Sequence, residues 1–177
     1  MSDALVVYES VFGDAEKIAL AVAGGLSAHL TVDVAAAHEA PTQIGPDVRL
    51  VVVGGPTHVL GMPRPSTRQG AVKQYGAQIT DTAMGLHEWL DRAQLPADVP
   101  AAAFDTRLNH PKLVVKIDHA ARTEEKLLKR HGATLVARAE HFAVTDTKGP
   151  LADGEEDRAR RWGQELAGLV TSRSAQT

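Results

Sequence analysis

Short apolar runs alternate with longer stretches of helical spacing along most of the chain. Five runs have the length and composition of strands, at residues 4–8, 30–35, 50–55, 100–104 and 133–137. Those at 4–8 and 50–53 are continuously apolar instead of alternating, which is typical of parallel strands buried on both faces. Strands that alternate with helices predict an α/β fold built on a doubly wound, five-stranded parallel sheet.

Four helices are predicted from apolar residues that recur at three- and four-residue spacing. They cover residues 15–30, 84–92, 118–131 and 155–170. Trp89 and Trp162 fall on apolar helix faces, so we expect both in the core. The connection 36–47 contains prolines and has room only for a short helix. The connection 56–82 is long, polar and interrupted by prolines, and connections of this kind are usually functional or mobile.

The composition narrows the class of protein. The chain has 177 residues, a formal net charge of −3 and no cysteine. This length predicts one domain, residues 1–171, followed by a polar tail at 172–177 that we expect to be flexible. The mild charge gives no basic field for nucleic acid, and no stretch approaches the length of a membrane span. Because disulfides and Cys-ligated metals are excluded and no N-terminal signal is seen, we expect a cytoplasmic protein.

Loops at the carboxyl ends of the strands are the candidate binding loops, because ligands of open parallel sheets bind there. They are residues 9–14, 54–65, 104–112 and 140–150. The first reads "ESVFGDAEK" and leads into a helix whose free N–H groups suit a phosphate. Ser10 offers a hydroxyl, and Gly13 allows a tight turn. The same residues also fit a plain helix start, with Asp14 complementing the helix dipole.

The next two loops offer different chemistry. In "GGPTHVLGMPRPSTR", the apolar residues after His58 either cover a flat ring or pack against the long connection. In "AFDTRLNHP", Arg107 either faces an anion or a ring, or lies on the surface. The eight histidines are scattered without ligand spacing. Hydrolase, NTPase and Rossmann interpretations lose their main support because the GxSxG, GxxxxGK[ST] and GxGxxG patterns are missing.

Three segments together resemble the flavodoxin family. They are "YESVFGDAEKIA" at the first strand, "VVVGGPTHVLGM" at the third and "AFDTR" at the fourth. Certain flavodoxin-domain proteins are similar in two further segments, "GGPTH…GM.RP.TR" and a late "TKGPL.DGE", here "TKGPLADGE" at 147–155. The resemblance spans the chain from about Ala4 to Val170. It implies a three-layer α/β/α fold with strand order 2-1-3-4-5 and an FMN cofactor.

The resemblance also implies a set of FMN-binding residues. In the family the first loop holds the FMN phosphate, and the other two flank the isoalloxazine ring. The implied phosphate loop consists of Ser10, Val11, Phe12, Gly13, Asp14 and Ala15. The implied ring-flanking residues are Pro56, Thr57, His58, Val59, Leu60, Gly61, Thr106 and Arg107. We expect no catalytic side chain and no metal ligand.

Three positions of the phosphate loop depart from the family pattern. Asp14 stands where a neutral or basic residue is usual, Ala15 replaces a threonine, and Phe12 stands where a hydroxyl is common. Each lost hydroxyl costs about 0.5–1.5 kcal/mol of hydrogen bonding, and a carboxylate near a phosphate adds repulsion. At about 1.4 kcal/mol per tenfold, we expect FMN affinity one or two orders of magnitude weaker. FMN is therefore the expected cofactor, either weakly bound or lost.

Two hypotheses of function follow. The first is an FMN-binding redox protein that transfers electrons or reduces a small acceptor such as a quinone. The second is a flavodoxin-like domain that has lost FMN and acts as a binding or regulatory module. The expected partner is a redox protein or a small-molecule acceptor, with no nucleic acid and no membrane. Homodimerisation and enzymatic activity stay open.

A further hypothesis concerns the long polar connection. Residues 63–82 would form a lid in which Arg64, Arg68 and Lys73 close over a bound anion. The alternative is a solvated surface loop.

Overall fold

One parallel sheet organises the protein. The computed structural model describes residues 2–57, 62–108 and 120–174. The strands are β1 (Ala4–Tyr8), β2 (Val32–Ala36), β3 (Leu50–Pro56), β4 (Pro100–Leu108), β5 (Thr134–Leu135) and β6 (Glu140–Val144). Their order is β2-β1-β3-β4-β5, with β6 also paired to β4, and every pair is parallel. This confirms the doubly wound α/β fold and the order 2-1-3-4-5.

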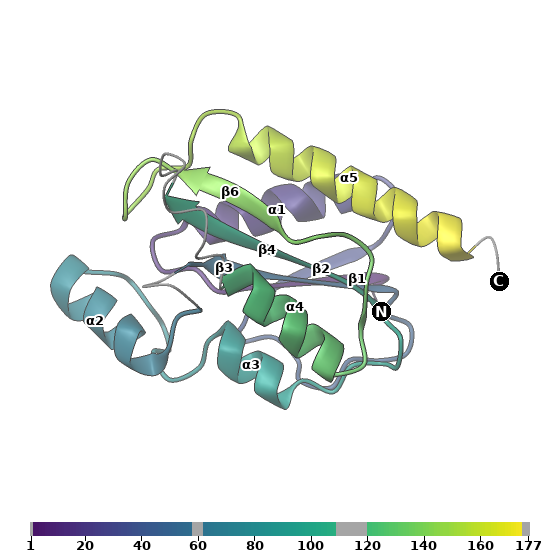
Figure 1. The fold of residues 1–177 in the computed structure, drawn as a ribbon, viewed down its shortest axis with the longest axis horizontal. Helices are drawn as coiled ribbons and strands as arrows, with labels where there is room; N and C mark the ends of the chain where they lie inside the picture. Colours follow the sequence, from purple (N-terminus) through teal and green to yellow (C-terminus); the bar gives the residue numbers. More distant parts are fainter. Residues whose placement is uncertain (1, 58–61, 109–119, 175–177) are drawn as a thin grey trace.

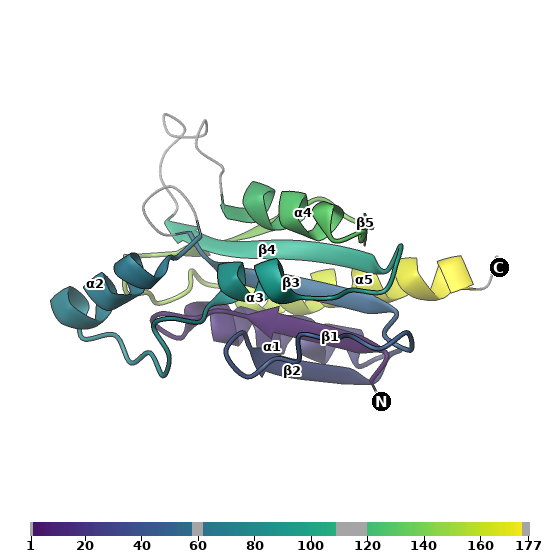
Figure 2. The ribbon, with the colours of Figure 1, turned by 90° about the horizontal axis from the view of Figure 1, so that it is seen from below.

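Helices cover both faces of the sheet. Figures 1 and 2 show α1 (Asp14–Leu26) and α5 (Glu155–Ser174) on one face. The other face is covered by α3 (Leu86–Arg92) and α4 (Ala120–Arg130). The remaining helix, α2 (Pro65–Tyr75), lies beyond the carboxyl ends of the strands and covers neither face (Figure 1). The arrangement is the expected three-layer sandwich.

Side chains of the central strands alternate between two cores. Val6 and Val52 face α1 and α5, whereas Val7 and Val53 face α3 and α4. The side chains on both faces of these strands are buried, which explains why the strands are apolar at every position. As predicted, Trp162 lies in the first core and Trp89 in the second.

Glycines let α1 and α5 approach each other closely. A Cβ at Gly25 would collide with the backbone carbonyl of Arg160, and a Cβ at Gly163 would collide with that of Val22. A glycine inside a helix costs about 1 kcal/mol in propensity. Here that cost is offset by the close packing of α1 against α5.

The connection 56–82 contains a helix that the sequence pattern does not predict. Pro65 sits in the first turn of α2, Thr67 Oγ1 accepts a hydrogen bond from Arg64 N at 2.8 Å, and Gly76 ends the helix with φ 68°. These are ordinary helix signals. The apolar stripe is missing, however, because Arg68 and Ala71 are the buried residues of the helix.

The structure has two strands, β5 and β6, in the region where the sequence predicts a single fifth strand at 133–137. Thr134 and Leu135 pair with the start of β4, and β6 pairs with residues 104–108 further along it. The strand predicted at 133–137 is therefore too long, and β6 was missed. Its sequence, "EHFAV", begins with two polar residues, so it lacks the uniformly apolar character of a buried strand.

The remaining boundaries differ in smaller ways. The connection 36–47 contains turns and no helix, and every residue in it is described. The last helix continues through Ser174, three residues past the predicted domain end at 171. None of the helices described has the length and apolar character needed to cross a membrane.

Candidate functional site

The segment after β1 lies where the winding of the sheet reverses. β1 pairs with β2 on one side and with β3 on the other. The chain leaving β1 enters α1 on one face, while the chain leaving β3 leads to α3 on the opposite face (Figure 2). Crevices at such a reversal are the usual ligand sites of open α/β sheets. Residues 10–15, called loop 10–15 below, occupy this position.

The backbone of loop 10–15 presents hydrogen-bond donors. Gly13 precedes α1 with φ 97°, a conformation that favours glycine, and its N–H donates to Ser10 Oγ at 3.0 Å. A Cβ at Gly13 would meet no atom within 4 Å, so the space beside it is open. Among the described residues, none accepts a hydrogen bond from the N–H groups of Val11, Phe12, Asp14 and Ala15. Free N–H groups at a helix start suit an anion.

Apolar side chains of the same loop hold it against α2. Val11 is buried against Ala71 and Ala77, and the ring of Phe12 meets that of Tyr75 edge-on at 6.3 Å between centroids. The loop is therefore braced from outside by α2 and the residues that follow it. This bracing fixes the direction of the N–H groups before any ligand arrives.

Asp14 is held away from the solvent. Its side chain is buried, and Lys17 Nζ lies 3.6 Å from Oδ1. The carboxylate also lies against Gly149, where a Cβ would collide with Oδ2. Lys17 partly neutralises the charge that the sequence marks as unfavourable for phosphate.

The other predicted residues divide into three groups. Thr57 N donates to Thr106 O at 2.9 Å, so these two residues meet at the edge of the sheet next to Pro56. The strand β4 runs through Leu108, so Thr106 and Arg107 belong to the strand and the prediction of a loop beginning at 104 is wrong. Pairing with β6 extends β4 past its apolar run. The predicted residues His58, Val59, Leu60 and Gly61 lie outside the described part of the chain.

A buried polar row crosses the sheet beneath these loops, and sequence reasoning missed it. Asp105 is fully buried and pairs in register with Gly55 and His141, and Glu9 N donates to the carbonyl of Gly54 one position earlier. Oδ1 of Asp105 lies 2.9 Å from His141 Nδ1, and Oδ2 lies 3.2 Å from Thr57 Oγ1. The available signal was a polar residue inside an otherwise apolar strand.

Glu124 of α4 adds another buried carboxyl group. Its side chain is 1 % exposed, and Oε2 has no hydrogen-bond partner among the described residues. Burial, with a smaller contribution from the charges of Asp105 and Glu9, raises the pKa of Glu124 well above its ordinary value. Burial likewise raises the pKa of Glu9, although Leu86 N–H and the Arg68 guanidinium act in the opposite direction.

Arg68 is an internal anchor. It is 1 % exposed, and its guanidinium reaches Glu9 Oε1 at 3.1 Å and Glu88 Oε2 at 2.5 Å. Its Nε also donates to the carbonyl of Thr82 at 2.8 Å. The lid hypothesis is therefore wrong for Arg68, because this side chain is already enclosed. It ties α2 to the end of β1 and to α3.

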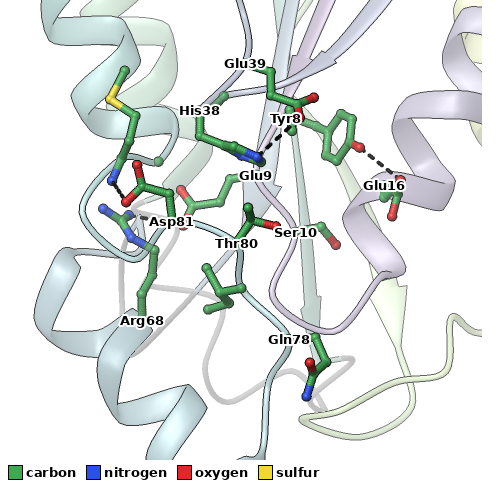
Figure 3. Close-up of a pocket in the computed structure, with 15 residues that line it drawn as sticks. Tyr8, Glu9, Ser10, Glu16, His38, Glu39, Arg68, Gln78, Thr80 and Asp81 are labelled. Atoms are coloured by element: carbon green, nitrogen blue, oxygen red, sulfur yellow. Dashed lines mark hydrogen bonds and ion pairs between the residues drawn. The ribbon is translucent and has the colours of Figure 1, made fainter.

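A pocket of about 270 Å³ opens beside loop 10–15, at the carboxyl ends of β1 and β2 (Figure 3). Its lining includes four carboxylates, on Glu9, Glu16, Glu39 and Asp81. Tyr8 OH donates to Glu16 Oε1 at 2.9 Å, and burial, followed by this bond, raises the pKa of Tyr8 to about 12. Most of the charged residues that line the pocket are carboxylates, so a phosphate is better placed at the N–H groups of loop 10–15 than inside it.

Solved structures with the same fold are flavodoxins and flavodoxin-like proteins. A flavodoxin from the domain Archaea has a TM-score of 0.61 and 15% identity, over 95% of this chain and 98% of its own. The flavodoxin, WrbA-like protein from Agrobacterium tumefaciens has a TM-score of 0.60 and 18% identity, over 97% and 99%. Oxidised Flavodoxin 2 from Bacillus cereus has a TM-score of 0.57 and 16% identity, over 97% of this chain and 99% of its own.

Sequence comparison adds no closer relationship. No protein-family model matches the chain, and no curated protein matches it either. At identities of 15–18%, the structural likeness establishes the fold. The chain is a flavodoxin-like α/β domain.

Proposed function

We propose that this protein binds FMN and acts as a redox protein, either as an electron carrier or as a reductase of a small acceptor such as a quinone. The observation that carries the proposal is loop 10–15. Its N–H groups, which have no acceptor among the described residues, and the open space at Gly13 fit a phosphate group, at the N-terminus of α1 in a flavodoxin-like sheet. The flavodoxins among its structural neighbours support the same assignment.

In this proposal each part of FMN has its own place in the site. The backbone of loop 10–15 and the Ser10 hydroxyl would hold the phosphate. The flat ring would lie beside Pro56 at the end of β3, the following residue Thr57 and the adjacent end of β4. When bound, FMN supplies electron-transfer chemistry, and the protein contributes position and electrostatics. The Thr57–Asp105–His141 hydrogen bonds fix the edge of the sheet beneath this position.

Titration with FMN tests the proposal directly. The purified protein is first inspected for flavin absorbance, and the apoprotein is then titrated while flavin fluorescence is followed. We expect quenching that saturates at micromolar FMN. Unchanged fluorescence throughout the titration would rule the proposal out. Turnover of NAD(P)H with a quinone then distinguishes a reductase from a carrier, because a carrier alone gives no steady-state turnover.

The second candidate function is a binding or regulatory module without FMN. It is favoured by the chemistry of loop 10–15, where Ala15 is buried without a hydroxyl and Asp14 brings a carboxylate. In this case the titration shows no FMN binding while the folded protein is intact by circular dichroism.

The Asp14→Asn variant is expected to bind FMN about three- to tenfold more tightly than the wild type. Removing one negative charge near a phosphate dianion lowers repulsion, and tenfold corresponds to about 1.4 kcal/mol. The measurement is the FMN dissociation constant from fluorescence quenching. Asp33→Asn is the matched control, since it makes the same charge change at an exposed position of β2. Equal affinity in the Asp14→Asn variant and the control would show that the carboxylate does not disturb the site.

The Ala15→Thr change restores the hydroxyl that family members carry, and it is best measured separately. Ala15 is buried, so the larger side chain must displace its neighbours at a cost of about 1–3 kcal/mol. The FMN dissociation constant and the unfolding free energy are therefore compared together. Tighter binding with lower stability is the expected combination.

A further inference from the structure

The segment "TKGP" at 147–150 has no role in the site as described so far. It lies in the connection from β6 to α5, which reaches the same end of the sheet as loop 10–15 and α2 (Figures 1 and 2). Hydrogen bonds from Thr145 N to Pro150 O and from Gly149 N to Asp146 O, both 2.9 Å, close it into a compact turn. Gly149 then lies directly against the Asp14 carboxylate.

Lys148 extends from this turn to the Tyr75 ring of α2, the helix that packs against loop 10–15. Its backbone neighbour Gly149 touches Asp14 at one end of the loop. Its Nζ lies 5.5 Å from the centre of the Tyr75 ring, and that ring meets Phe12 at 6.3 Å. Lys148 is therefore connected to the loop on two sides: its neighbour Gly149 lies against Asp14, and its ammonium group lies beside the Tyr75 ring that contacts Phe12.

The charged side chains around loop 10–15 leave a bound phosphate without a cation of its own, so the cation must come from another segment. Asp14 and Glu16 place two carboxylates in the first turn of α1. Lys17 is paired with Asp14, and Glu16 accepts a hydrogen bond from Tyr8. Lys148 is exposed, and its contact with Tyr75 is a cation–π interaction of the weak, exposed kind. Its ammonium group is therefore able to exchange this contact for a stronger one with a phosphate.

We propose that Lys148 is a phosphate-binding residue, which closes over a phosphate monoester held by loop 10–15. This assignment rests on the proposed function for its natural ligand, FMN. It gives the "TKGP" turn a role, since the turn carries the lysine to a loop whose own side chains supply no unpaired positive charge. Without a bound phosphate, the cation–π contact with Tyr75 keeps the ammonium group near the site.

Comparison of FMN with riboflavin tests the role of Lys148, because riboflavin has the same ring and lacks the phosphate. In the Lys148→Met variant we expect the dissociation constant for FMN to rise about tenfold, with that for riboflavin unchanged. Lys129→Met, at the far end of α4, is the matched control and is expected to change neither. A change of equal size for both ligands, or no change for FMN, overturns the assignment.

Inorganic phosphate gives a second measurement that does not depend on flavin binding. Phosphate is expected to raise the melting temperature of the wild type and of the Lys129→Met variant in a saturable manner, and to have a smaller effect on the Lys148→Met variant. If the wild type binds no FMN, the proposed function fails, and the phosphate experiment still decides the role of Lys148. Identical phosphate responses in the wild type and the Lys148→Met variant overturn it.

Discussion

The Arg68→Met variant is expected to lose about 3–5 kcal/mol of unfolding free energy, the range found when one partner of a buried ion pair is removed. Without the guanidinium, Glu9 and Glu88 stay close together as uncompensated carboxylates, and Glu9 is 7 % exposed. Carbonyl oxygens of Pro63 and Thr82 also lose their donor. Because a domain of this kind has a total of only about 5–15 kcal/mol, the loss is large. Urea denaturation followed by circular dichroism measures it.

Two further variants show whether charge is the cause. Lys73→Met removes an exposed lysine from the same helix and is expected to change stability by less than about 0.5 kcal/mol. Adding Glu9→Gln to Arg68→Met removes one of the stranded charges and should recover part of the loss. If the double variant is as unstable as Arg68→Met alone, packing and not charge explains the effect.

Loss of Arg68 should also weaken ligand binding at the candidate site. This side chain attaches α2 to the end of β1, and α2 in turn covers Val11 of loop 10–15. With the anchor removed, we expect the loop to be less preorganised and FMN to bind more weakly, even under conditions where the variant is folded.

The Glu124→Gln variant is expected to remove much of the pH dependence of stability that appears as the pH rises above the ordinary glutamate pKa of 4.5. The pKa of Glu124 is raised in the folded protein relative to an ordinary value of 4.5, mainly by burial. The folded state therefore keeps a proton that the unfolded chain releases as the pH rises. Stability from this group is fully present below the unfolded pKa and falls by about 1.4 kcal/mol per pH unit until the folded pKa is passed.

Gln has the shape of a protonated Glu and does not titrate. The stabilities of the wild type and the variant should therefore be similar near pH 5 and diverge as the pH rises. At pH 8 the variant should be the more stable. The measurement is the urea midpoint at a series of pH values, with Glu165→Gln on the exposed side of α5 as control. Parallel curves for wild type and the Glu124→Gln variant would contradict the expected role of this carboxyl group. Glu9, whose pKa is also raised, supplies a remaining slope in both proteins.

Several strands and helices could be predicted from the sequence because each depends on a local pattern of apolar residues. The uninterrupted apolar runs at β1 and β3 mark strands with a core on each face, and the stripes that contain Trp89 and Trp162 mark helices that cover them. The position of loop 10–15 follows from a strand, a glycine and a helix in succession. These signals lie within a few residues of one another, so the sequence carries them without tertiary context.

Elements held by contacts distant in sequence were missed. The helix α2 buries an arginine in place of an apolar stripe, and the partner that makes this burial favourable, Glu9, is 59 residues away. The strand β6 begins with Glu140 and His141, whose place in the sheet is set by pairing with β4. In both cases the residues look solvent-exposed until the partner is known.

The sequence by itself determined the alternation of strands and helices and the helix faces, and it predicts which loop is most suited to a phosphate. The sheet order came from the resemblance to the flavodoxin family. Only the tertiary structure decided what lies around that loop: Arg68 as an internal anchor, the hydrogen bond between buried Asp105 and half-buried His141, and Lys148 beside the Tyr75 ring. The physical reason is that the free energy of a charged group depends on burial and on nearby charges. Both are properties of the folded arrangement, and residue type and local spacing do not report them.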